Sequence, residues 1–218
     1  MQIIYQDKDI VVCVKDPGVL STDEPGGMPE LVRAELGNPK ACVRTVHRLD
    51  QVVSGLMVMA RSPEAASALS RQIRERTFHK EYMAVVRGVP APVCGTMTDL
   101  LRRDAAERRT YVASEPGKDT QEAILNYGTQ ASKEGLSLVQ IALKTGRTHQ
   151  IRVQFSSRGL PLWGDRKYGG DETEEAIALW SSRLRFRHPK HGFQMDFHLD
   201  PPCRTPWNIF FEAEKRTI

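Results

Sequence analysis

The chain contains three short segments in which glycine is combined with side chains that bind anions or exchange protons. In chain order they are His47-Arg48-Leu49-Asp50 (followed by Ser54-Gly55), Gly146-Arg147-Thr148-His149-Gln150 and Gly164-Asp165-Arg166-Lys167-Tyr168-Gly169. Each lies at the edge of an apolar stretch that predicts a β-strand. Loops at the ends of rigid elements commonly carry catalytic groups, so we expect a functional site here.

The first segment alone does not identify a reaction. A His-Arg-Leu-Asp string occurs by chance, and Arg48 and Asp50 would then form a local ion pair that fixes a turn. Tyr82 has a similar ordinary interpretation, as a core aromatic residue with its hydroxyl at the surface. The order of several motifs along the chain carries more information than any one of them.

Four motifs in this order resemble the large family of RNA pseudouridine synthases, which modify uridines of ribosomal RNA and tRNA. They are His47 to Gly55, Lys80 to Ala84, Gly146 to Val153 and Gly164 to Gly169. The resemblance begins at Ile3-Ile4-Tyr5 and extends to Arg187-His188-Pro189, so it covers nearly the whole chain. It implies an isomerase that converts uridine in RNA to pseudouridine.

The resemblance implies three catalytic residues. Asp50 matches the family's catalytic carboxylate, and Arg147 matches the basic residue that pairs with it and holds its charge in place. Tyr82 matches the tyrosine that stacks on the target uracil, and it is a candidate to take the proton from carbon 5. Three routes remain open for Asp50: attack on the sugar, addition to the base, or removal of a sugar proton.

The resemblance also implies a set of substrate-binding residues. Arg48 matches the arginine that fills the space left by a flipped uridine, because a stacked uracil cannot reach a pocket inside the protein. The other members are neighbours in the motifs: His47, Thr148, His149, Gln150, Ile151 and Arg152. Uridine and pseudouridine differ only in which ring atom is bonded to ribose, so we expect no cofactor and no metal.

Three positions depart from the family's pattern. Asp16 is inserted into a segment that is normally Lys-Pro-x-Gly, Val53 stands where threonine is usual, and Trp180 stands where histidine is common. None of them is an implied catalytic residue. We therefore expect them to affect substrate specificity more than activity.

The elements that must position these residues form an α+β pattern. Serine, proline and acidic residues at the start predict a helix from Ser62 to about Arg76, and helices are also expected over Pro29–Leu36 and Asp171–Leu179. Thr148 to Ser157 fits both periodicities, and the resemblance implies a helix there. Apolar stretches predict strands at residues 3–5, 10–14, 54–60, 82–86, 110–113, 123–127, 136–143, 182–186 and 193–199.

The chain has no repeat, linker or low-complexity tract, so we expect one catalytic domain over residues 1–218. The resemblance implies a single α+β domain with a mixed, largely antiparallel central sheet flanked by helices, and an active-site cleft across the sheet. It also implies a short form without the accessory RNA-binding domain that many relatives carry before the catalytic domain.

Charge distribution bears on the partner. The formal net charge is only +4 and the isoelectric point about 8.9. The arginines form two clusters: Arg102, Arg103, Arg108 and Arg109 around one loop, and Arg183, Arg185 and Arg187 on one face of an expected strand. Each cluster is either a solvated surface or a contact for RNA phosphates. We expect a monomer that binds a structured rRNA or tRNA stem-loop, with neither DNA nor a membrane as a partner.

Cysteine, histidine and apolar content set further bounds. The 4 cysteines and 6 histidines are dispersed, which predicts reduced thiols and no metal site. The first residues lack the pattern of a signal peptide, and no segment approaches the roughly 20 apolar residues of a membrane span. A cytoplasmic location is the expectation.

Two rival functions use the same sequence features. A relative that binds RNA or acts as an RNA chaperone without catalysis would not need Asp50, Tyr82 and Arg147 together. A hydrolytic glycosidase would need two carboxylates that flank one bond, whereas the motifs offer one dominant aspartate. Detection of pseudouridine after incubation with RNA separates these functions.

Overall fold

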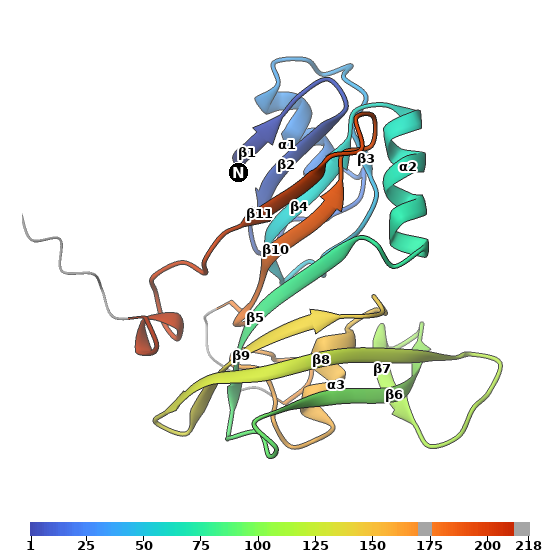
Figure 1. The fold of residues 1–218 in the computed structure, drawn as a ribbon. Coiled ribbons are helices and arrows are strands. Elements are labelled where there is room, and N and C mark those ends of the chain that lie inside the picture. Colours follow the sequence, from blue (N-terminus) through green and yellow to red (C-terminus); the bar gives the residue numbers. More distant parts are fainter. Residues whose placement is uncertain (170–175, 212–218) are drawn as a thin grey trace, which may run out of the picture. The chain divides into compact units, whose positions relative to one another are not determined.

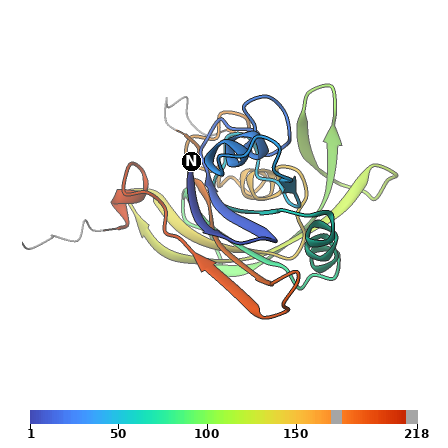
Figure 2. The same ribbon diagram turned by 90° about the horizontal axis from the view of Figure 1, so that it is seen from above.

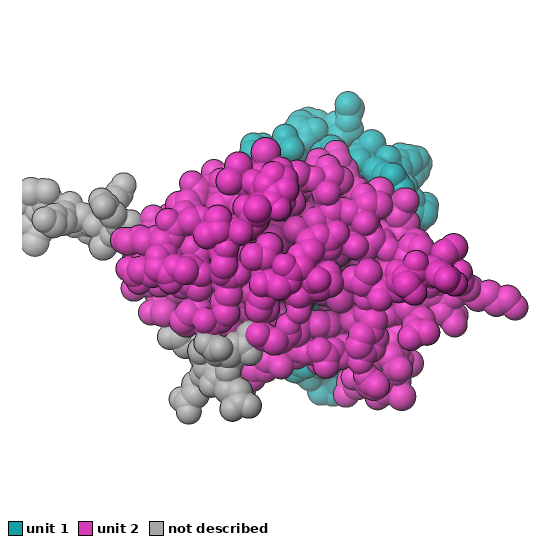
Figure 3. All heavy atoms as spheres, turned by 90° about the horizontal axis from the view of Figure 1, so that it is seen from below, with its two compact units in different colours: residues 1–81, 180–199 teal, residues 82–179, 200–218 magenta. Residues whose placement is uncertain are grey.

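The structure is a computed structural model that describes residues 1–169 and 176–211 (Figure 1). The chain forms two compact units, which are described separately below (Figure 3). Unit 1 consists of residues 1–81 and 180–199, and unit 2 of residues 82–179 and 200–218. Within the described residues, no helix has the length and apolar character needed to cross a membrane.

Unit 1 is built on a mixed sheet. Its strands pair in the order β1-β2-β4-β10, with β3 also paired to β4 and β11 to β10. The pairing of β4 with β10 is parallel, and the β1–β2, β2–β4, β3–β4 and β10–β11 pairs are antiparallel. Helices α1 and α2 lie apart from each other (Figures 1 and 2). The bounds are β1 Gln2–Gln6, β2 Ile10–Lys15, α1 Met28–Glu35, β3 Arg44–Thr45, β4 Ser54–Ala60, α2 Pro63–Arg74, β10 Leu179–Arg187 and β11 Gln194–His198.

Local sequence features explain the elements around the centre of unit 1. The carboxylate of Asp7 accepts the backbone N–H groups of Asp9 at 2.7 Å and Ile10 at 2.8 Å, which fixes the turn between β1 and β2. All residues of β2 and β4 are buried, so these strands form the core of the sheet. The Ser62 hydroxyl accepts the N–H of Ala65 at 3.0 Å and caps α2.

The parallel β4–β10 pair depends on a glycine at the start of β4. Gly55 has φ +117°, and a Cβ at this position would lie 2.5 Å from the backbone nitrogen of Ser181 in β10. Any other residue would therefore push the two strands apart. The glycine that follows the Asp50 loop in sequence is thus required by the packing of the sheet.

Unit 2 contains the antiparallel part of the fold. Its strands pair in the order β5-β9-β8-β6-β7, and the β9–β8, β8–β6 and β6–β7 pairs are antiparallel. Helix α3 packs against β6 and β7, and residues Leu101, Ala123, Val153 and Tyr168 form a buried cluster. Strand β5 begins in unit 1 and continues into unit 2. The bounds are β5 His79–Arg87, β6 Cys94–Asp104, β7 Arg109–Ala113, β8 Thr120–Lys133, β9 Leu136–Leu143, α3 Gln150–Ser156 and the 3₁₀ turn Trp207–Ile209.

The α+β prediction is confirmed, as are most of the expected elements. Helix α2 ends at Arg74, two residues before the expected end, and the ambiguous segment is the helix α3. Strand β6 was not predicted, and β8 extends well beyond the expected residues 123–127. The four cysteines are free thiols, as expected. The prediction of one catalytic domain over 1–218, with a cleft across its sheet, stays a prediction.

The helix expected over Asp171–Leu179 was partly wrong. Residues 170–175 lie outside the described part of the chain. The described remainder is not helical, because residues 176–178 form no regular element and Leu179 begins β10. The pairing of β10 with β4 places this end of the segment in the sheet.

Candidate active site

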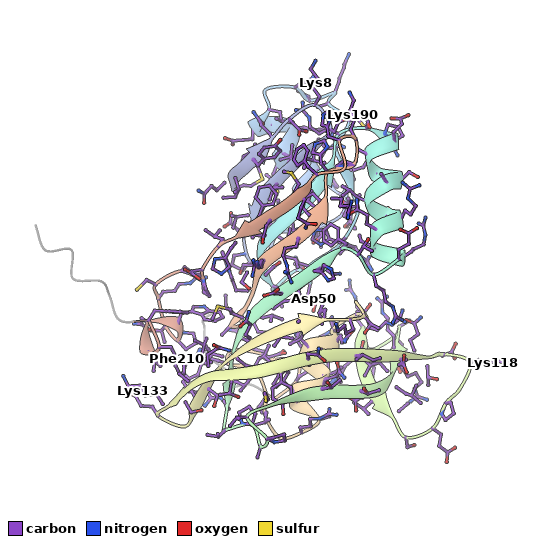
Figure 4. The ribbon with its side chains drawn as sticks, in the orientation of Figure 1. Lys8, Asp50, Lys118, Lys133, Lys190 and Phe210 are labelled. Atoms are coloured by element: carbon purple, nitrogen blue, oxygen red, sulfur yellow. The ribbon has the colours of Figure 1, made fainter. Side chains whose placement is uncertain are left out.

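Asp50 lies on the loop between β3 and β4 in unit 1 (Figure 4). The Ser21 hydroxyl accepts the N–H of the preceding residue, Leu49, at 3.1 Å and donates to its carbonyl at 2.7 Å. The carbonyl of Asp50 accepts the N–H of Val53 at 2.9 Å, which closes a turn. Leu49 is buried and Asp50 is half-buried. The half-buried carboxylate is therefore carried on backbone that is fixed on both sides.

Lys15 supports this loop from the end of β2. Its side chain is fully buried, and Nζ donates to the carbonyls of Asp16 at 3.0 Å, Gln51 at 2.8 Å and Val53 at 2.7 Å. Burial lowers the pKa of Lys15 to about 8, although the negative charges of Asp50 and Asp16 act in the opposite direction. The buried ammonium of Lys15 thus holds the carbonyls of Gln51 and Val53, which come shortly after Asp50, and it interacts favourably with the negative charge of Asp50.

His47 and Arg48 occupy different environments on the same loop. His47 is buried, its Nε2 accepts the N–H of Val58 at 3.1 Å, and its Nδ1 has no hydrogen-bond partner among the described residues. Burial, assisted by the charge of Lys80, lowers the pKa of His47 to about 3, so the ring is neutral. Arg48 is exposed. The buried His47 therefore supports the backbone of β4, whereas the side chain of Arg48 is accessible to solvent.

Arg147 lies on the loop before α3 in unit 2. It is exposed, and its Nε donates to the carbonyl of Glu122 at 2.9 Å. The side-chain oxygen of Gln150 accepts the N–H of Arg147 at 3.0 Å and the Thr145 hydroxyl at 2.8 Å. Gln150 is only 3% exposed, so it acts as a buried brace for this loop.

The remaining residues of the second motif surround the start of α3. Thr148 and His149 are half-buried, and His149 has a left-handed backbone with φ 56°. Ile151 and Arg152 are buried within the helix. Arg152 donates two hydrogen bonds to the buried carboxylate of Asp165, at 2.8 and 2.7 Å. The predicted contact of these residues with RNA stays a prediction, and the burial of Ile151 and Arg152 favours a supporting role.

The predicted catalytic residues are divided between the two units. Asp50 belongs to unit 1, whereas Arg147 and Tyr82 belong to unit 2. Tyr82 lies on β5 and is 5% exposed. The assembly of the three residues into one site therefore stays a prediction.

Sequence reasoning missed the residues that brace the two loops. Lys15, Ser21 and Asp165 were given no role, although each is buried and bonded to the predicted site or its loop. One signal was present, because Lys15 ends an otherwise apolar strand. A lysine in such a position needs polar partners inside the protein.

The three departures from the family's pattern have local structural explanations. The carboxylate of Asp16 lies 3.3 Å from the amino group of Met1. The Val53 side chain is buried, while its carbonyl accepts a hydrogen bond from Lys15. The indole nitrogen of Trp180 donates to the carbonyl of Leu199 at 2.8 Å.

The three arginines of the β10 cluster differ in their partners. Arg183 pairs with Asp196 at 2.6 Å and Arg185 pairs with Glu81 at 3.0 Å, so two of the three strand arginines are neutralised within unit 1. Arg187 is exposed at the end of β10, where the side chain of Gln72 binds its backbone N–H and carbonyl, both at 2.8 Å. This contact places the end of α2 beside Arg187. The exposed arginines in and just after that end of α2 are Arg71, Arg74 and Arg76.

Comparisons with known proteins identify the family. Residues 9–157 match the model of the RNA pseudouridylate synthase family. The dual-specificity RNA pseudouridine synthase RluA of Escherichia coli is 35% identical over 208 residues, which are 89% of this chain and 90% of that protein. The uncharacterized RNA pseudouridine synthase YlyB of Bacillus subtilis is 32% identical over 213 residues, which are 93% of this chain and 69% of that protein.

Solved structures show the same fold. The human RNA pseudouridylate synthase domain containing 1 has a TM-score of 0.78 at 24% identity, over 92% of this chain and 83% of that chain. The human RNA pseudouridylate synthase domain containing 4 has a TM-score of 0.75 at 22% identity, over 92% and 88%. Family model, relatives and fold agree. The chain belongs to the family of RNA pseudouridine synthases, the isomerases that convert uridine in RNA to pseudouridine.

Proposed function

We propose that Asp50 is the carboxylate that starts this isomerisation, with Arg147 and Tyr82 as its partners. The observation that carries the proposal is the loop of Asp50, which Ser21 and Lys15 hold from both sides. The bond between ribose and nitrogen 1 breaks, and a bond between ribose and carbon 5 forms. Carbon 5 loses a proton and nitrogen 1 gains one, so the atoms balance without an oxidant or a cofactor.

The test of Asp50 is a substitution that removes its charge and keeps its shape. Asp50→Asn should bind RNA normally and form no pseudouridine, measured by mass spectrometry of the RNA. Glu24→Gln is a matched control, because it removes one exposed carboxylate from the same unit. Product from Asp50→Asn near the wild-type rate would disprove the assignment. Wild-type protein that binds RNA without forming product would support an inactive RNA-binding relative instead.

Arg147 is proposed to hold the charge of Asp50 through a two-point contact, because a guanidinium is always charged and planar. Arg147→Met should lose most activity, and the acid limb of the pH–rate profile should move to higher pH. Arg147→Lys keeps the positive charge, so its acid limb should move less than that of Arg147→Met. A profile that does not move, at a near-normal rate, would show that the two side chains do not act together.

Arg48 is proposed to fill the space that the flipped uridine leaves. Arg48→Ala should slow the reaction most on a structured stem-loop, where unstacking costs a few kcal/mol, and much less on a flexible single strand with the same uridine. The exposed Arg44→Ala is a control for loss of one nearby charge. An equal loss on both RNAs, together with a lower melting temperature, would instead indicate a turn-stabilising ion pair.

Phosphate contacts in unit 1 are proposed to come from arginines that have no acidic partner among the described residues. Replacement of Arg71, Arg74 and Arg187 by glutamine should reduce the slope of log affinity against log salt concentration, by up to about one unit per lost contact. Replacement of Arg183 and Arg185, which are paired with acids, should reduce this slope less for each arginine replaced. Equal reductions per arginine would show that the ion pairs open when RNA binds.

The substrate is proposed to be a structured rRNA or tRNA stem-loop, bound by a monomer in the cytoplasm. The whole chain is proposed to act as one catalytic domain. Mapping of pseudouridine in RNA from cells with and without this protein identifies the RNA and the position. Light scattering of the protein, alone and with that RNA, tests the monomer.

A further inference from the structure

The turn between β10 and β11 in unit 1 exposes two aromatic rings. Phe193 is 51% exposed, and His191, two residues before it in the same turn, is also exposed. Their ring centroids are 6.0 Å apart, and the two planes are nearly parallel, at 8°. Exposed apolar side chains are ordinary when they are scattered singly, but here one exposed ring has a second beside it.

A third ring holds the two exposed rings in place. His188 is 2% exposed, and its ring centroid lies 5.1 Å from that of Phe193 and 4.8 Å from that of His191. Nε2 of His188 lies 2.8 Å from the carboxylate of Asp7, which is in the turn between β1 and β2. Its Nδ1 accepts the backbone N–H groups of Lys190 and His191 at 3.2 and 3.1 Å. The buried ring is therefore bonded to both turns, and it gives the exposed rings a fixed support.

Basic side chains lie at the same end of unit 1. Lys190 is in the turn of the exposed rings, Lys8 is in the turn between β1 and β2, and both are exposed. Figure 4 shows both lysines at this end of the unit. The exposed Arg187 ends β10, and two hydrogen bonds place the end of α2, with the exposed Arg71 and Arg74, beside it. The rings thus lie among cations from three parts of the chain.

The two turns also contain two carboxylates. That of Asp7 faces inward, because its oxygens accept hydrogen bonds from Tyr5 and from two backbone N–H groups and lie against His188. That of Asp9 is half-buried, and it forms with His188 and His191 a group whose ligand atoms lie within 4.8 Å of one another. These are donor types of a metal site, but both ring nitrogens of His188 already have hydrogen-bond partners. The exposed charges of the two turns are positive.

This end of unit 1 is remote from Asp50. The Asp50 loop precedes Ser54, the first residue of β4, whereas the turn between β1 and β2 precedes Ile10, which pairs with Ala60 at the other end of β4. Strand residues advance about 3.3 Å each, so the two ends of β4 are roughly 20 Å apart. Figure 4 shows Asp50 at the opposite end of the unit from the two lysines. RNA at the exposed rings would therefore lie outside the nucleotide that is proposed to react.

We propose that Phe193 and His191 form a stacking surface for unpaired bases of the RNA, in a segment that flanks the modified nucleotide. Every base has a flat face that stacks on an aromatic ring whatever the sequence, and the neighbouring cations bind the phosphates of the same strand. At about 3.4 Å per stacked nucleotide, roughly six nucleotides cover the distance to the Asp50 loop. The proposal rests on the proposed function only in taking RNA as the ligand.

The first test locates RNA on the wild-type protein. A single-stranded oligouridine that contains 5-iodouridine is bound to the protein and irradiated, which links an iodinated base to an aromatic side chain that it contacts. Mass spectrometry of the peptides should find a link at Phe193 or His191. Links confined to peptides outside this turn would overturn the proposal.

The second test measures the contribution of the ring by fluorescence anisotropy. Phe193→Ala should weaken binding of the oligouridine by about 5–10-fold, the lower end of the range for one stacked base. Phe193→Leu keeps an apolar side chain and should lose as much, whereas Phe193→Trp should bind at least as tightly as the wild type. Ile4→Ala is the control, because it removes a partly exposed apolar side chain of unit 1 that has no ring.

An abasic strand of the same length separates stacking from phosphate contacts. It keeps the phosphates and lacks the bases, so Phe193→Ala should weaken its binding by about 2-fold or less. Equal losses on the two strands, or no loss on either, would overturn the proposal. Normal binding by Phe193→Leu would show an apolar contact without stacking, and it would overturn the proposal as well.

Neither test depends on turnover or on the stability of a variant alone. If Phe193→Ala lowers the melting temperature, the link formed on the wild-type protein still decides. Product formation by Asp50→Asn would remove the proposed catalytic role and leave the stacking surface standing. Absence of the link at this turn would refute the stacking surface and leave Asp50 untouched.

Discussion

Lys15→Met replaces a fully buried ammonium with an apolar side chain of similar length, and its effect on stability can be worked out from the structure. The substitution removes the Lys15 donor from three carbonyls; that of Val53 is fully buried, whereas that of Gln51 still accepts the N–H of Gly18. A buried polar group without a partner costs about 1–3 kcal/mol, while the other two carbonyls are partly accessible to water. We expect the free energy of unfolding to fall by about 2 kcal/mol at pH 7.

The same substitution should change how stability depends on pH. The pKa of Lys15 is about 8 in the folded protein and 10.5 in the unfolded chain, because burial disfavours the charge. Between these values the unfolded chain binds more protons, so stability rises with pH. The free energy of unfolding of the wild type should therefore increase relative to Lys15→Met, by up to about 2 kcal/mol between pH 8 and pH 10.

Urea unfolding of both proteins at several pH values measures this difference, and other groups that titrate in this range cancel in the comparison. Lys8→Met is the control, because Lys8 is exposed in the turn of the same hairpin and its loss should leave the profile unchanged. A difference that is flat from pH 7.5 to pH 10 would refute the claim that burial disfavours the charge. A mutant as stable as the wild type at pH 7 would refute the role of the carbonyl contacts.

Three further substitutions test other parts of the fold. Burial alone would raise the pKa of Asp7, but its hydrogen bonds lower the pKa to about 2. Asp7→Asn should therefore remove about 2 kcal/mol of stability, which is present above about pH 4 and is lost as pH falls through about 2. Acid titration of the free energy of unfolding measures this loss. Gly55→Ala should prevent folding, as judged by circular dichroism, because its Cβ would collide with Ser181. Asp165→Asn should lower stability by about 3–5 kcal/mol in urea unfolding, because the buried Arg152 would lose the carboxylate to which it donates two hydrogen bonds.

Each of these has a matched control. Asp9→Asn removes a half-buried charge from the same turn and leaves the hydrogen bonds that Asp7 accepts, so the loss of stability at low pH that depends on Asp7 should remain. Gly117→Ala adds a Cβ where the nearest atom is 3.9 Å away, and it should fold normally. Asp196→Asn breaks a surface pair with Arg183 and should cost far less than Asp165→Asn. Similar losses from the surface pair and the buried pair would contradict the argument from burial.

The elements with strong local signals were predictable. Strand β4 matches the expected residues 54–60 because every residue in it is buried, and α2 starts where its serine cap and proline predict. Strand β6 was missed because its inward-facing residues, such as Met97 and Leu101, are separated by polar residues and bring no continuous apolar stretch. Its pairing with β7 and β8 comes from tertiary structure, which a local pattern does not contain.

The candidate site was predictable as motifs and not as a set of contacts. Glycine spacing and the resemblance located the loops of Asp50 and Arg147. They did not distinguish Arg48, which is exposed, from Arg152, which is buried on Asp165. That distinction depends on which face of a helix or loop packs inward. The Tyr168 hydroxyl likewise contacts Thr110 and His149, which are 58 and 19 residues away in sequence.

The parallel contact between β4 and β10 has a consequence for synthesis of the chain. The Ser181 hydroxyl in β10 binds the carbonyl of Leu56 in β4, and the two residues are 125 positions apart. At about 5–20 residues per second, a ribosome needs roughly 6–25 seconds between these points. During this interval one edge of a strand that is fully buried in the folded protein has no partner in the nascent chain. We therefore expect truncated nascent chains that end before β10 to aggregate or to recruit chaperones.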